Sequence, residues 1–408
     1  MKILNFGSCN IDYVYSVDHI VVPGETTASS ALELFCGGKG LNQSIALARA
    51  GVAVYHAGCI GSDGKMLLDI LRENRVDTTN IRVVSGQSGH AIIQVNKAGE
   101  NSILLYGGAN RQVTAEFIDE VLAQFSPGDF LLLQNEISNL GYLIEKAYSL
   151  GMKIVFNPAP FEQYLNDIDC SMLYCLILNE VEAQGFTGKA EPREALAYFS
   201  QRYPELKVVL TLGKQGCIYA DRAKILHHPA FQVEAVDTTA AGDTFIGYFL
   251  AALARNVSCE AALRRANAAA ALTVSRKGAA PSIPFEEEVR QMLPRLQANT
   301  ADRKTNFKQK LERFLDENLA DARLYDFARK MGYSESHTGE LVRQYTGKTF
   351  SELLWNKRCA VAAQCLRETD MPVEEIITGI GCQNESFFRK KFRAVYDMTP
   401  HQYRKTQR

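Results

Sequence analysis

The sequence of 408 residues lacks three features that would each assign it to a particular class of protein. It has no apolar run near the roughly 18 residues that a membrane-spanning helix needs. Its ten cysteines include no Cys-x-x-Cys pair, which argues against a zinc site or a disulfide framework and favours reduced thiols. Residues 1–5 turn polar too early for a signal peptide. We therefore expect a cytoplasmic protein with no membrane partner.

Net charge is also nearly absent, but the charges are unevenly distributed. The formal charge of the whole chain is −1. Residues 301–408 hold 20 Lys and Arg against 15 Asp and Glu, a surplus of +5, which leaves −6 for residues 1–300. A basic tail favours a nucleic-acid partner, although +5 suits many soluble domains. The length and the apolar fraction of 46% predict two or three globular domains.

The stretch at residues 237–247 combines small residues with a carboxylate. Ala240, Ala241 and Gly242 leave backbone N–H groups open at the start of a predicted helix, where the helix dipole attracts anions. Gly242 also permits a turn conformation that bulkier residues resist. Asp243 lies beside this site and can accept a proton from a hydroxyl. The pattern suits phosphoryl transfer to an alcohol, and the alternative is a capped helix after a small-residue turn.

A second glycine-rich stretch, Gly37-Gly38-Lys39-Gly40, leads into a helical run at residues 44–50. Paired glycines bring the backbone close to a small polar ligand, and Asn42 can point its amide at that ligand. Strand-to-helix turns of this kind are common, so the signal is weak by itself. The stretch is not a P-loop, because no Gly-x-x-x-x-Gly precedes the lysine.

Helical runs alternate with apolar strands between residues 117 and 225, which predicts a parallel sheet with crossover helices. Such sheets bind ligands at the carboxyl ends of their strands. Polar or small residues stand at these ends, although Asn10 and Asp12 could instead form a simple turn. The candidates are Asn10, Asp12, Asn135, Glu136, Asn157, Asn179, Glu182, Thr211, Gly213 and Gly216. Segments 13–35 and 89–105 alternate like exposed strands, and we expect them to form a flap.

An alanine-rich helix at residues 259–275 carries Asn267, and a loop of small residues follows at 276–282. Residues 294–306 lose periodicity and turn polar, so we interpret them as a linker. The pattern beyond is all helical. Turns at Gly332 and Gly381 each separate two helices, which predicts two helix-turn-helix units rather than a plain bundle. The last helix of the second unit gathers four basic residues, Arg389, Lys390, Lys391 and Arg393, which favours phosphate contacts.

The first 293 residues resemble ribokinase and the wider PfkB family of sugar kinases. The resemblance rests on the strand exit at residues 7–12, the glycine-rich box at 37–42 and the stretch at 237–247. It implies roles at matching positions. Sugar hydroxyls would contact Asn10, Asp12, Gly38, Lys39, Asn42 and Glu136. Asp243 would be the catalytic base and Ala240, Ala241 and Gly242 the anion hole.

The same resemblance implies the ATP, magnesium and potassium sites. The nucleotide would lie along Asn179, Thr211, Gly213, Gly216, Gly242 and Asn267. Glu182 with Asn179 would organise Mg²⁺. The monovalent cation, K⁺, would be bound largely through backbone carbonyls at Asp237, Thr239, Thr273, Arg276, Gly278 and Ser282.

Residues 307–408 resemble the AraC-type DNA-binding domain. The second unit matches closely, at Gly381, Ser386 and Phe388 among others, whereas the first departs from the pattern at Thr338 and Glu340. A carboxylate in the first recognition helix repels phosphate, but it can accept a hydrogen bond from a cytosine amino group. The candidate DNA contacts are Ser336, His337, Arg343, Glu385, Ser386, Arg389, Lys390 and Arg393.

The sequence therefore predicts an α/β ribokinase-like domain at residues 1–293, a linker at 294–306 and an all-α domain at 307–408. We expect ATP-dependent phosphorylation of a pentose, D-ribose at its terminal hydroxyl, by a homodimer that also binds double-stranded DNA. One alternative is a transcription regulator whose kinase fold only senses a sugar or its phosphate. Another is an enzyme whose tail serves assembly.

Overall fold

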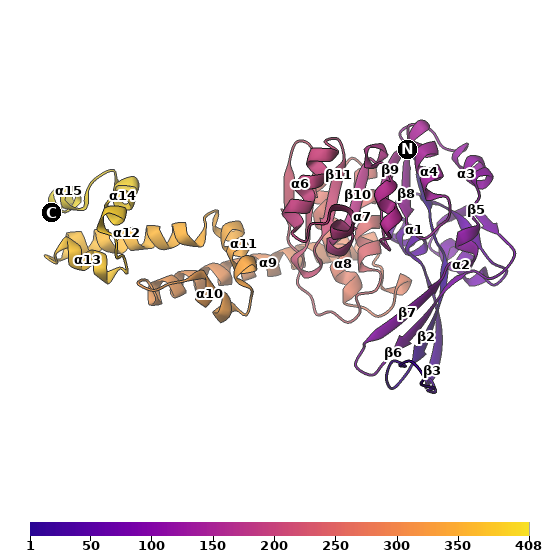
Figure 1. The fold of residues 1–408 in the computed structure, drawn as a ribbon, viewed down its shortest axis with the longest axis horizontal. Coiled ribbons are helices and arrows are strands. Elements are labelled where there is room, and N and C mark those ends of the chain that lie inside the picture. Colours follow the sequence, from indigo (N-terminus) through magenta and orange to yellow (C-terminus); the bar gives the residue numbers. More distant parts are fainter. Residues whose placement is uncertain (408) are drawn as a thin grey trace. The chain divides into compact units, whose positions relative to one another are not determined.

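The computed structural model describes residues 1–407, without the side chains of residues 297–303. The chain forms two compact units, which divide between Gln297 and Ala298 (Figure 1). This division falls inside the predicted linker at residues 294–306. The predicted domain boundaries themselves stay predictions.

The first unit is built on a nine-stranded sheet in the order β13-β12-β11-β10-β9-β8-β1-β4-β5. Neighbours from β5 to β11 run parallel, and only the pairs β11–β12 and β12–β13 are antiparallel. The strands are β1 Ile3–Phe6, β4 Tyr55–Ile60, β5 Asp77–Val83, β8 Phe130–Gln134, β9 Lys153–Asn157, β10 Cys175–Asn179, β11 Lys207–Thr211, β12 Cys217–Ala220 and β13 Ile225–His228. The predicted ribokinase-like α/β fold is thereby confirmed.

Helices cover both faces of this sheet, because successive strand side chains point to opposite sides. Phe130 and Leu132 join the core under α1, α2, α7 and α8, whereas Leu131 and Leu133 join the core under α3 to α6. The helices are α1 Lys39–Arg49, α2 Lys65–Glu73, α3 Ala115–Leu122, α4 Leu140–Ser149, α5 Glu180–Thr187, α6 Pro192–Arg202, α7 Ala241–Ala254 and α8 Cys259–Val274. Fully buried strands account for the continuous apolar runs in the sequence.

A second, four-stranded sheet forms the predicted flap, which extends from the body of the first unit (Figure 1). Its order is β3-β2-β6-β7, and only β2 and β6 pair in parallel. The strands are β2 Asn10–Ser16, β3 Ala31–Gly37, β6 Gly89–Val95 and β7 Asn101–Tyr106. Gly99 has a φ of 81° in the predicted hairpin turn, a conformation that glycine adopts without strain.

The second unit is helical and has two cores joined by one long helix. Phe314, Phe327 and Val342 lie in the first core, and Ile377, Phe388 and Phe392 lie in the second. The helices are α10 Leu324–Met331, α11 Glu335–Thr346, α12 Phe350–Glu368, α13 Val373–Gly379, α14 Glu385–Tyr396 and α15 Pro400–Gln407. α12 contributes to both cores, so each helix-turn-helix unit packs against one half of it.

The predicted linker is helical in the structure, because it lies within α9, Glu286–Glu317. Its Gln, Arg, Lys and Ala residues favour helix, and its sequence carries no apolar repeat. The loss of periodicity therefore marked the absence of an apolar face rather than the absence of helix. Among the described residues, no helix is both long and apolar enough to cross a membrane.

Candidate active site

Asp243 lies in the first turn of α7, where the backbone opens onto free space. Ala240 caps the helix with a left-handed φ of 58°, and a side chain built on Gly242 would meet nothing within 4 Å. The residue with a positive φ in this turn is Ala240 and not Gly242. Gly242 is helical, and its missing side chain leaves room beside the first N–H groups of the helix. Ala241 N donates to Thr238 O at 3.3 Å, so this N–H is not open as expected, and the anion site at the start of α7 stays a prediction.

The carboxylate of Asp243 is buried and accepts hydrogen bonds from two amides of α1. Asn42 Nδ2 donates to Asp243 Oδ2 at 3.0 Å, and Gln43 Nε2 donates to Asp243 Oδ1 at 2.9 Å. The glycine-rich box and the stretch at residues 237–247 thus meet, although about 200 residues separate them. Asn42 Oδ1 is buried and accepts no hydrogen bond from any described residue. It is an acceptor that a sugar hydroxyl could satisfy.

The other predicted sugar residues surround Glu136, which follows β8. Its carboxylate accepts hydrogen bonds from the hydroxyl of Ser8 and, at 3.1 Å, from the backbone N–H of Lys39. Asn10 Oδ1 accepts from Asn110 Nδ2 at 2.7 Å. Ser8 and Asn110 were not among the predicted sites. Asn110 lies in a short 3₁₀ segment, Gly108–Gln112, that carries no periodic signal.

Asp12 lies on β2 opposite Phe35 of β3, and its carboxyl reaches over the diagonal neighbour Gly37, where any side chain would overlap it. Burial, with a further contribution from Glu136, raises the pKa of Asp12 to about 7. Burial also raises the pKa of Glu136, despite the nearby ammonium of Lys39. Burial alone would lower the pKa of Lys39, but three carboxylates outweigh it and raise that pKa: Asp243, Glu136 and Glu182. The site therefore holds several carboxyl groups around one cation.

The raised pKa of Asp12 predicts a pH-dependent stability. Folding raises the pKa of this carboxyl from 3.8 to about 7, so the folded protein holds the proton more tightly than the unfolded chain does. The resulting contribution to the free energy of unfolding is fully present below pH 3.8 and is lost as the pH rises through about 7. Asn cannot ionise, so Asp12→Asn should raise the Tm of the sugar-free protein, by roughly 2–4 °C at pH 8 and by less at pH 5. The exposed Asp167→Asn is the matched control. An equal gain at both pH values for Asp12→Asn would contradict this explanation.

The predicted nucleotide residues lie along the ends of β10 and β11. Asn179 and Thr211 are directly paired across these strands. Asn179 caps α5 in a reciprocal capping box, in which Glu182 N donates to Asn179 Oδ1 and Asn179 N donates to Glu182 Oε2, both at 2.9 Å. Gly213 and Gly216 follow β11, and Asn267 Nδ2 of α8 lies 3.2 Å from the Cys217 sulfur. The structure therefore brings the predicted ATP-binding residues together at one edge of the sheet.

Glu182 is the single carboxylate at this edge that was predicted for magnesium. It is 6% exposed, and its pKa is raised by burial. The described residues contain no group of three His, Cys, Asp or Glu that could hold a metal. Mg²⁺ bound with a nucleotide commonly uses one or two carboxylates, water and the phosphates, so a lone Glu182 fits that mode of binding and not a protein cage.

The predicted cation residues meet where Asp237 contacts the loop after α8. Asp237 Oδ1 accepts from Thr239 N at 2.9 Å, and Asp237 Oδ2 accepts from Gly278 N at 2.9 Å. Burial alone would raise the pKa of Asp237, but the hydrogen bonds from Thr239 and Gly278 lower it. Thr273 and Ser282 bind neighbouring oxygens through their hydroxyls. An ionised carboxylate among backbone carbonyls is a donor set that suits a monovalent cation.

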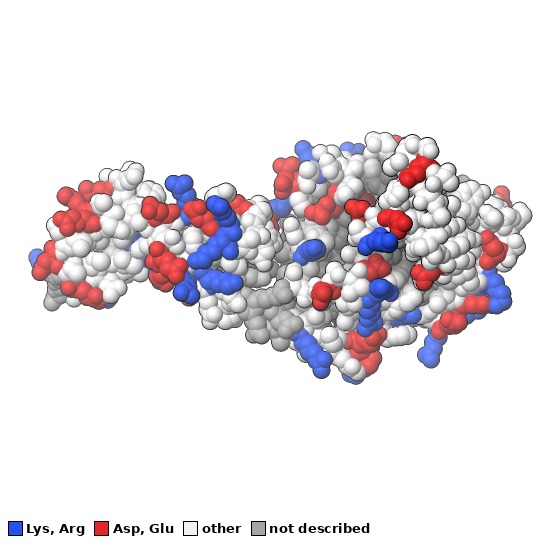
Figure 2. Space-filling view, turned by 90° about the horizontal axis from the view of Figure 1, so that it is seen from below, with Lys and Arg blue, Asp and Glu red and all other residues white. Residues whose placement is uncertain are grey.

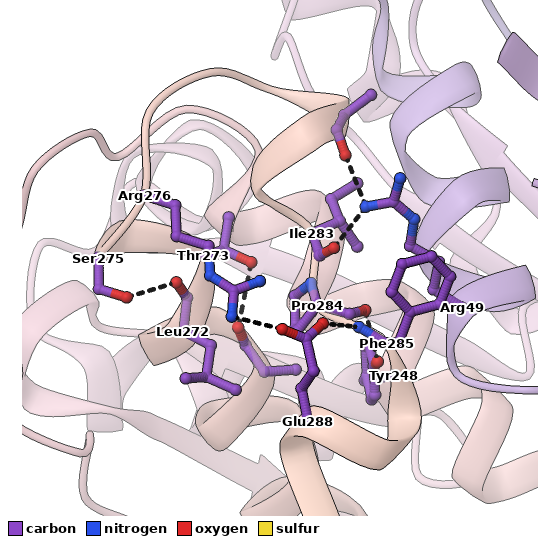
Figure 3. Close-up of polar contacts among 12 residues, drawn as sticks. Arg49, Tyr248, Leu272, Thr273, Ser275, Arg276, Ile283, Pro284, Phe285 and Glu288 are labelled. Carbon is purple, nitrogen blue, oxygen red and sulfur yellow. Dashed lines mark hydrogen bonds and ion pairs between the residues drawn. The ribbon is translucent and has the colours of Figure 1, made fainter. Parts of the chain in front are cut away.

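The loop that carries these carbonyls is tied to three helices (Figure 3). Arg49 of α1 donates to the carbonyl oxygens of Ala280 at 3.0 Å and Ile283 at 2.5 Å. Tyr248 of α7 donates to Pro284 O at 2.8 Å. Arg276 pairs with Glu288 of α9 at 2.7 Å, and because its guanidinium is itself a cation, only its backbone carbonyl could bind K⁺.

The predicted DNA contacts lie on α11 and α14. Exposed residues on these helices are Ser336, Arg343, Ser386, Lys390 and Arg393. His337 is half-buried against the Tyr333 ring, and Arg389 forms an ion pair with Glu385 one turn earlier. On the face seen in Figure 2, acidic and basic side chains lie side by side rather than in one basic surface. On this face, charge alone therefore does not mark a DNA-binding surface, and the exposed cations of α14 are the specific feature.

Comparison with known proteins defines the class to which this site belongs. Residues 1–286 match the pfkB family carbohydrate kinases, and residues 327–406 match a helix-turn-helix domain. The ribokinase of Haemophilus influenzae is 39% identical over 297 residues, covering 70% of this chain and 96% of its own. The deoxyribokinase of Salmonella typhi is 30% identical over 304 residues, covering 72% and 99%. The solved structure of Arabidopsis thaliana ribokinase complexed with ribose and ATP has a TM-score of 0.62 at 28% identity, covering 72% and 98%.

The fold and these similarities define a carbohydrate kinase joined to a DNA-binding domain. The chain belongs to the pfkB family of carbohydrate kinases, and its C-terminal part is an AraC-type helix-turn-helix domain. Both resemblances inferred from the sequence are confirmed.

Proposed function

We propose that this chain phosphorylates D-ribose at its terminal hydroxyl with ATP and also binds double-stranded DNA as a regulator of sugar use. The observation that carries the kinase proposal is the buried Asp243, which two amides of α1 hold beside the open first turn of α7. A carboxylate placed next to an anion site is what transfer of a phosphoryl group to an alcohol needs.

In this proposal, Asp243 takes the proton from the terminal sugar hydroxyl as that oxygen bonds to the γ-phosphorus of ATP. The bond between the γ-phosphorus and the bridging oxygen breaks, and ADP leaves. The N–H group of Gly242 would stabilise the charge on the transferred group, with the cation of Lys39 nearby. Mg²⁺, held near Glu182, would neutralise the phosphates. K⁺ at the Asp237 loop would support the backbone that forms the anion hole.

Ribose is preferred over a deoxy sugar because the site contains several acceptors for sugar hydroxyls. Asn10, Asp12, Asn42 and Glu136 all present side-chain oxygens, and Asn42 Oδ1 accepts no hydrogen bond from any described residue. A site built for a hydroxyl discriminates strongly against a substrate that lacks it.

The test compares kcat/KM for D-ribose and 2-deoxy-D-ribose in K⁺ and in tetramethylammonium salts. We expect ribose to be preferred by at least about 100-fold, and turnover of ribose to be higher in K⁺. Equal kcat/KM for the two sugars would overturn ribose specificity. Equal rates in the two salts would overturn the potassium site.

A homodimer is the proposed assembly, because the flap exposes an apolar stripe across all four strands. Leu34, Tyr13, Ile92 and Leu104 are paired in register on one face. Leu104 is 68% exposed and Leu34 is 49% exposed. Contiguous apolar surface on a sheet favours pairing with another copy.

Leu104→Arg should therefore convert the dimer to a monomer at micromolar concentration, as measured by sedimentation velocity. Val83→Arg is the matched control, because Val83 is an apolar residue on β5 outside the flap and is 59% exposed. A wild-type protein that sediments as a monomer, or a Leu104→Arg variant that stays dimeric, would refute the proposed interface.

The second candidate function is a regulator that senses a sugar without phosphorylating it. The helix-turn-helix domain favours this possibility, because a DNA-binding domain has no role in the phosphoryl transfer itself. The two candidates differ in one measurable property, which is turnover.

A further inference from the structure

Gln43 of α1 is completely buried and contacts Asp243 from the side opposite the terminal amide of Asn42. Its Nε2 donates to Asp243 Oδ1 at 2.9 Å and to Asn157 Oδ1 at 3.2 Å. Both acceptors are oxygens, so this end of the Gln43 side chain has to be the NH₂ group. Gln43 directly follows the glycine-rich box at residues 37–42, but sequence reasoning assigned it no role.

A second amide holds Gln43 in this orientation. Gln134 Nε2, at the end of β8, donates to Gln43 Oε1 at 2.7 Å and to Asn5 Oδ1 at 2.9 Å. Asn5 Nδ2 in turn donates to Gly40 O at 2.7 Å and to Ser44 Oγ at 2.8 Å. Each amide therefore has one orientation that satisfies its neighbours. Among the side-chain oxygens of Gln43, Gln134 and Asn5, only Gln134 Oε1 accepts no hydrogen bond from the described residues.

A buried chain of amides is costly unless each member is satisfied, and this one ends on the carboxylate proposed as the base. Without Gln43, Asp243 Oδ1 would lose its hydrogen-bond donor in a buried site. The charged groups that face Asp243 are Lys39 on α1, Glu136 after β8 and Glu182 on α5.

We propose that Gln43 is a positioning residue that orients Asp243 and favours its ionised form, and that Gln134 fixes the orientation of Gln43. The inference rests on the proposed role of Asp243 as the base. Gln43 does not face the sugar, so its substitution should lower kcat and leave the KM for the sugar nearly unchanged.

The experiment measures kcat and KM as functions of pH in the full-length protein, with saturating ATP and Mg²⁺. Gln43→Met keeps the length of the side chain and removes the donor. We expect kcat to fall roughly 10- to 100-fold, the effect of losing one hydrogen bond to a charged group, with KM for ribose within about threefold. The acid limb of the kcat profile should move to higher pH. Gln43→Glu should move it further, because it places a second carboxylate against Asp243.

Two further variants separate positioning from a structural role. Residue 134 does not contact Asp243, but Gln134→Met removes the hydrogen bond that holds the Gln43 amide and lets it turn. This variant should therefore also move the acid limb to higher pH, by a smaller amount. Gln124→Met, at an exposed glutamine of the same unit, should match the wild type. If Gln43→Met does not fold, Gln134→Met alone decides the question.

The contradicting result is a fall in kcat with an unmoved acid limb in both Gln43→Met and Gln134→Met, which would make the amide chain purely structural. Wild-type kinetics in both variants would also overturn the inference. If Asp243→Asn retains turnover, the base is misassigned and this inference fails with it. If Asp243→Asn is inactive while the glutamine variants are silent, only this inference fails.

Discussion

Replacing Asp243 by Asn should lower kcat for ribose phosphorylation by about 10²- to 10⁴-fold, the usual contribution of a general base. Asn keeps the shape of the side chain but cannot accept the hydroxyl proton. Sugar and ATP should still bind, because Asn10, Glu136 and the residues at the ends of β10 and β11 are unchanged. Isothermal titration measures the binding, and a coupled ADP assay measures turnover.

The geometry predicts a second property of this variant. Asn42 Nδ2 and Gln43 Nε2 both donate to Asp243, but an Asn side chain has only one acceptor oxygen. One hydrogen bond is therefore lost, and the Tm should fall slightly. Ser149→Ala, at an exposed site, is the control, and its turnover and Tm should match those of the wild type. Turnover within about threefold of the wild type would refute the assignment of Asp243 as the base.

Removing two basic side chains from α14 should weaken DNA binding by roughly 10- to 100-fold at 0.1 M salt. Lys390 and Arg393 are exposed, and neither has an ion-pair partner among the described residues. They are therefore better candidates for phosphate contacts than Arg389, which pairs with Glu385. The double variant Lys390→Ala, Arg393→Ala should reduce the slope of log K against log salt by about 2.

The measurement is a salt titration on a mixed-sequence duplex long enough to hold two half-sites. Lys308→Ala with Lys310→Ala is the matched control, because it removes the same charge from α9 in the same unit. Kinase turnover should be unchanged in both double variants. An equal loss of affinity in the control would mean that the effect is due to net charge and not to α14.

Sequence reasoning located most of the site because the relevant residues lie in short motifs at strand ends. Apolar runs predicted the strands, and parallel strands place their carboxyl ends at one edge, which brings Asn179 and Thr211 together. The resemblance to a known family assigned Asn42 and Asp243 to one sugar site, but their hydrogen bond is known only from the structure. Periodicity alone would not have shown that these two side chains meet.

The features that were missed depend on three-dimensional packing. Nothing in a single sequence distinguishes Gln43, which contacts the proposed base, from any other polar residue in a helix. The left-handed backbone at Ala240 was not foreseen, because glycine is the usual residue in that conformation. The linker was recognised by its composition, but composition did not show that α9 continues through it.

The most direct test of the central claim is product analysis with the purified full-length protein, D-ribose and Mg·ATP. Phosphorus NMR should show one ADP formed for every ribose 5-phosphate, and no such product with Asp243→Asn. The contradicting result is a wild-type protein that ribose stabilises against heat, but that forms no more sugar phosphate than Asp243→Asn does. That outcome would make the first unit a sugar sensor attached to a DNA-binding domain.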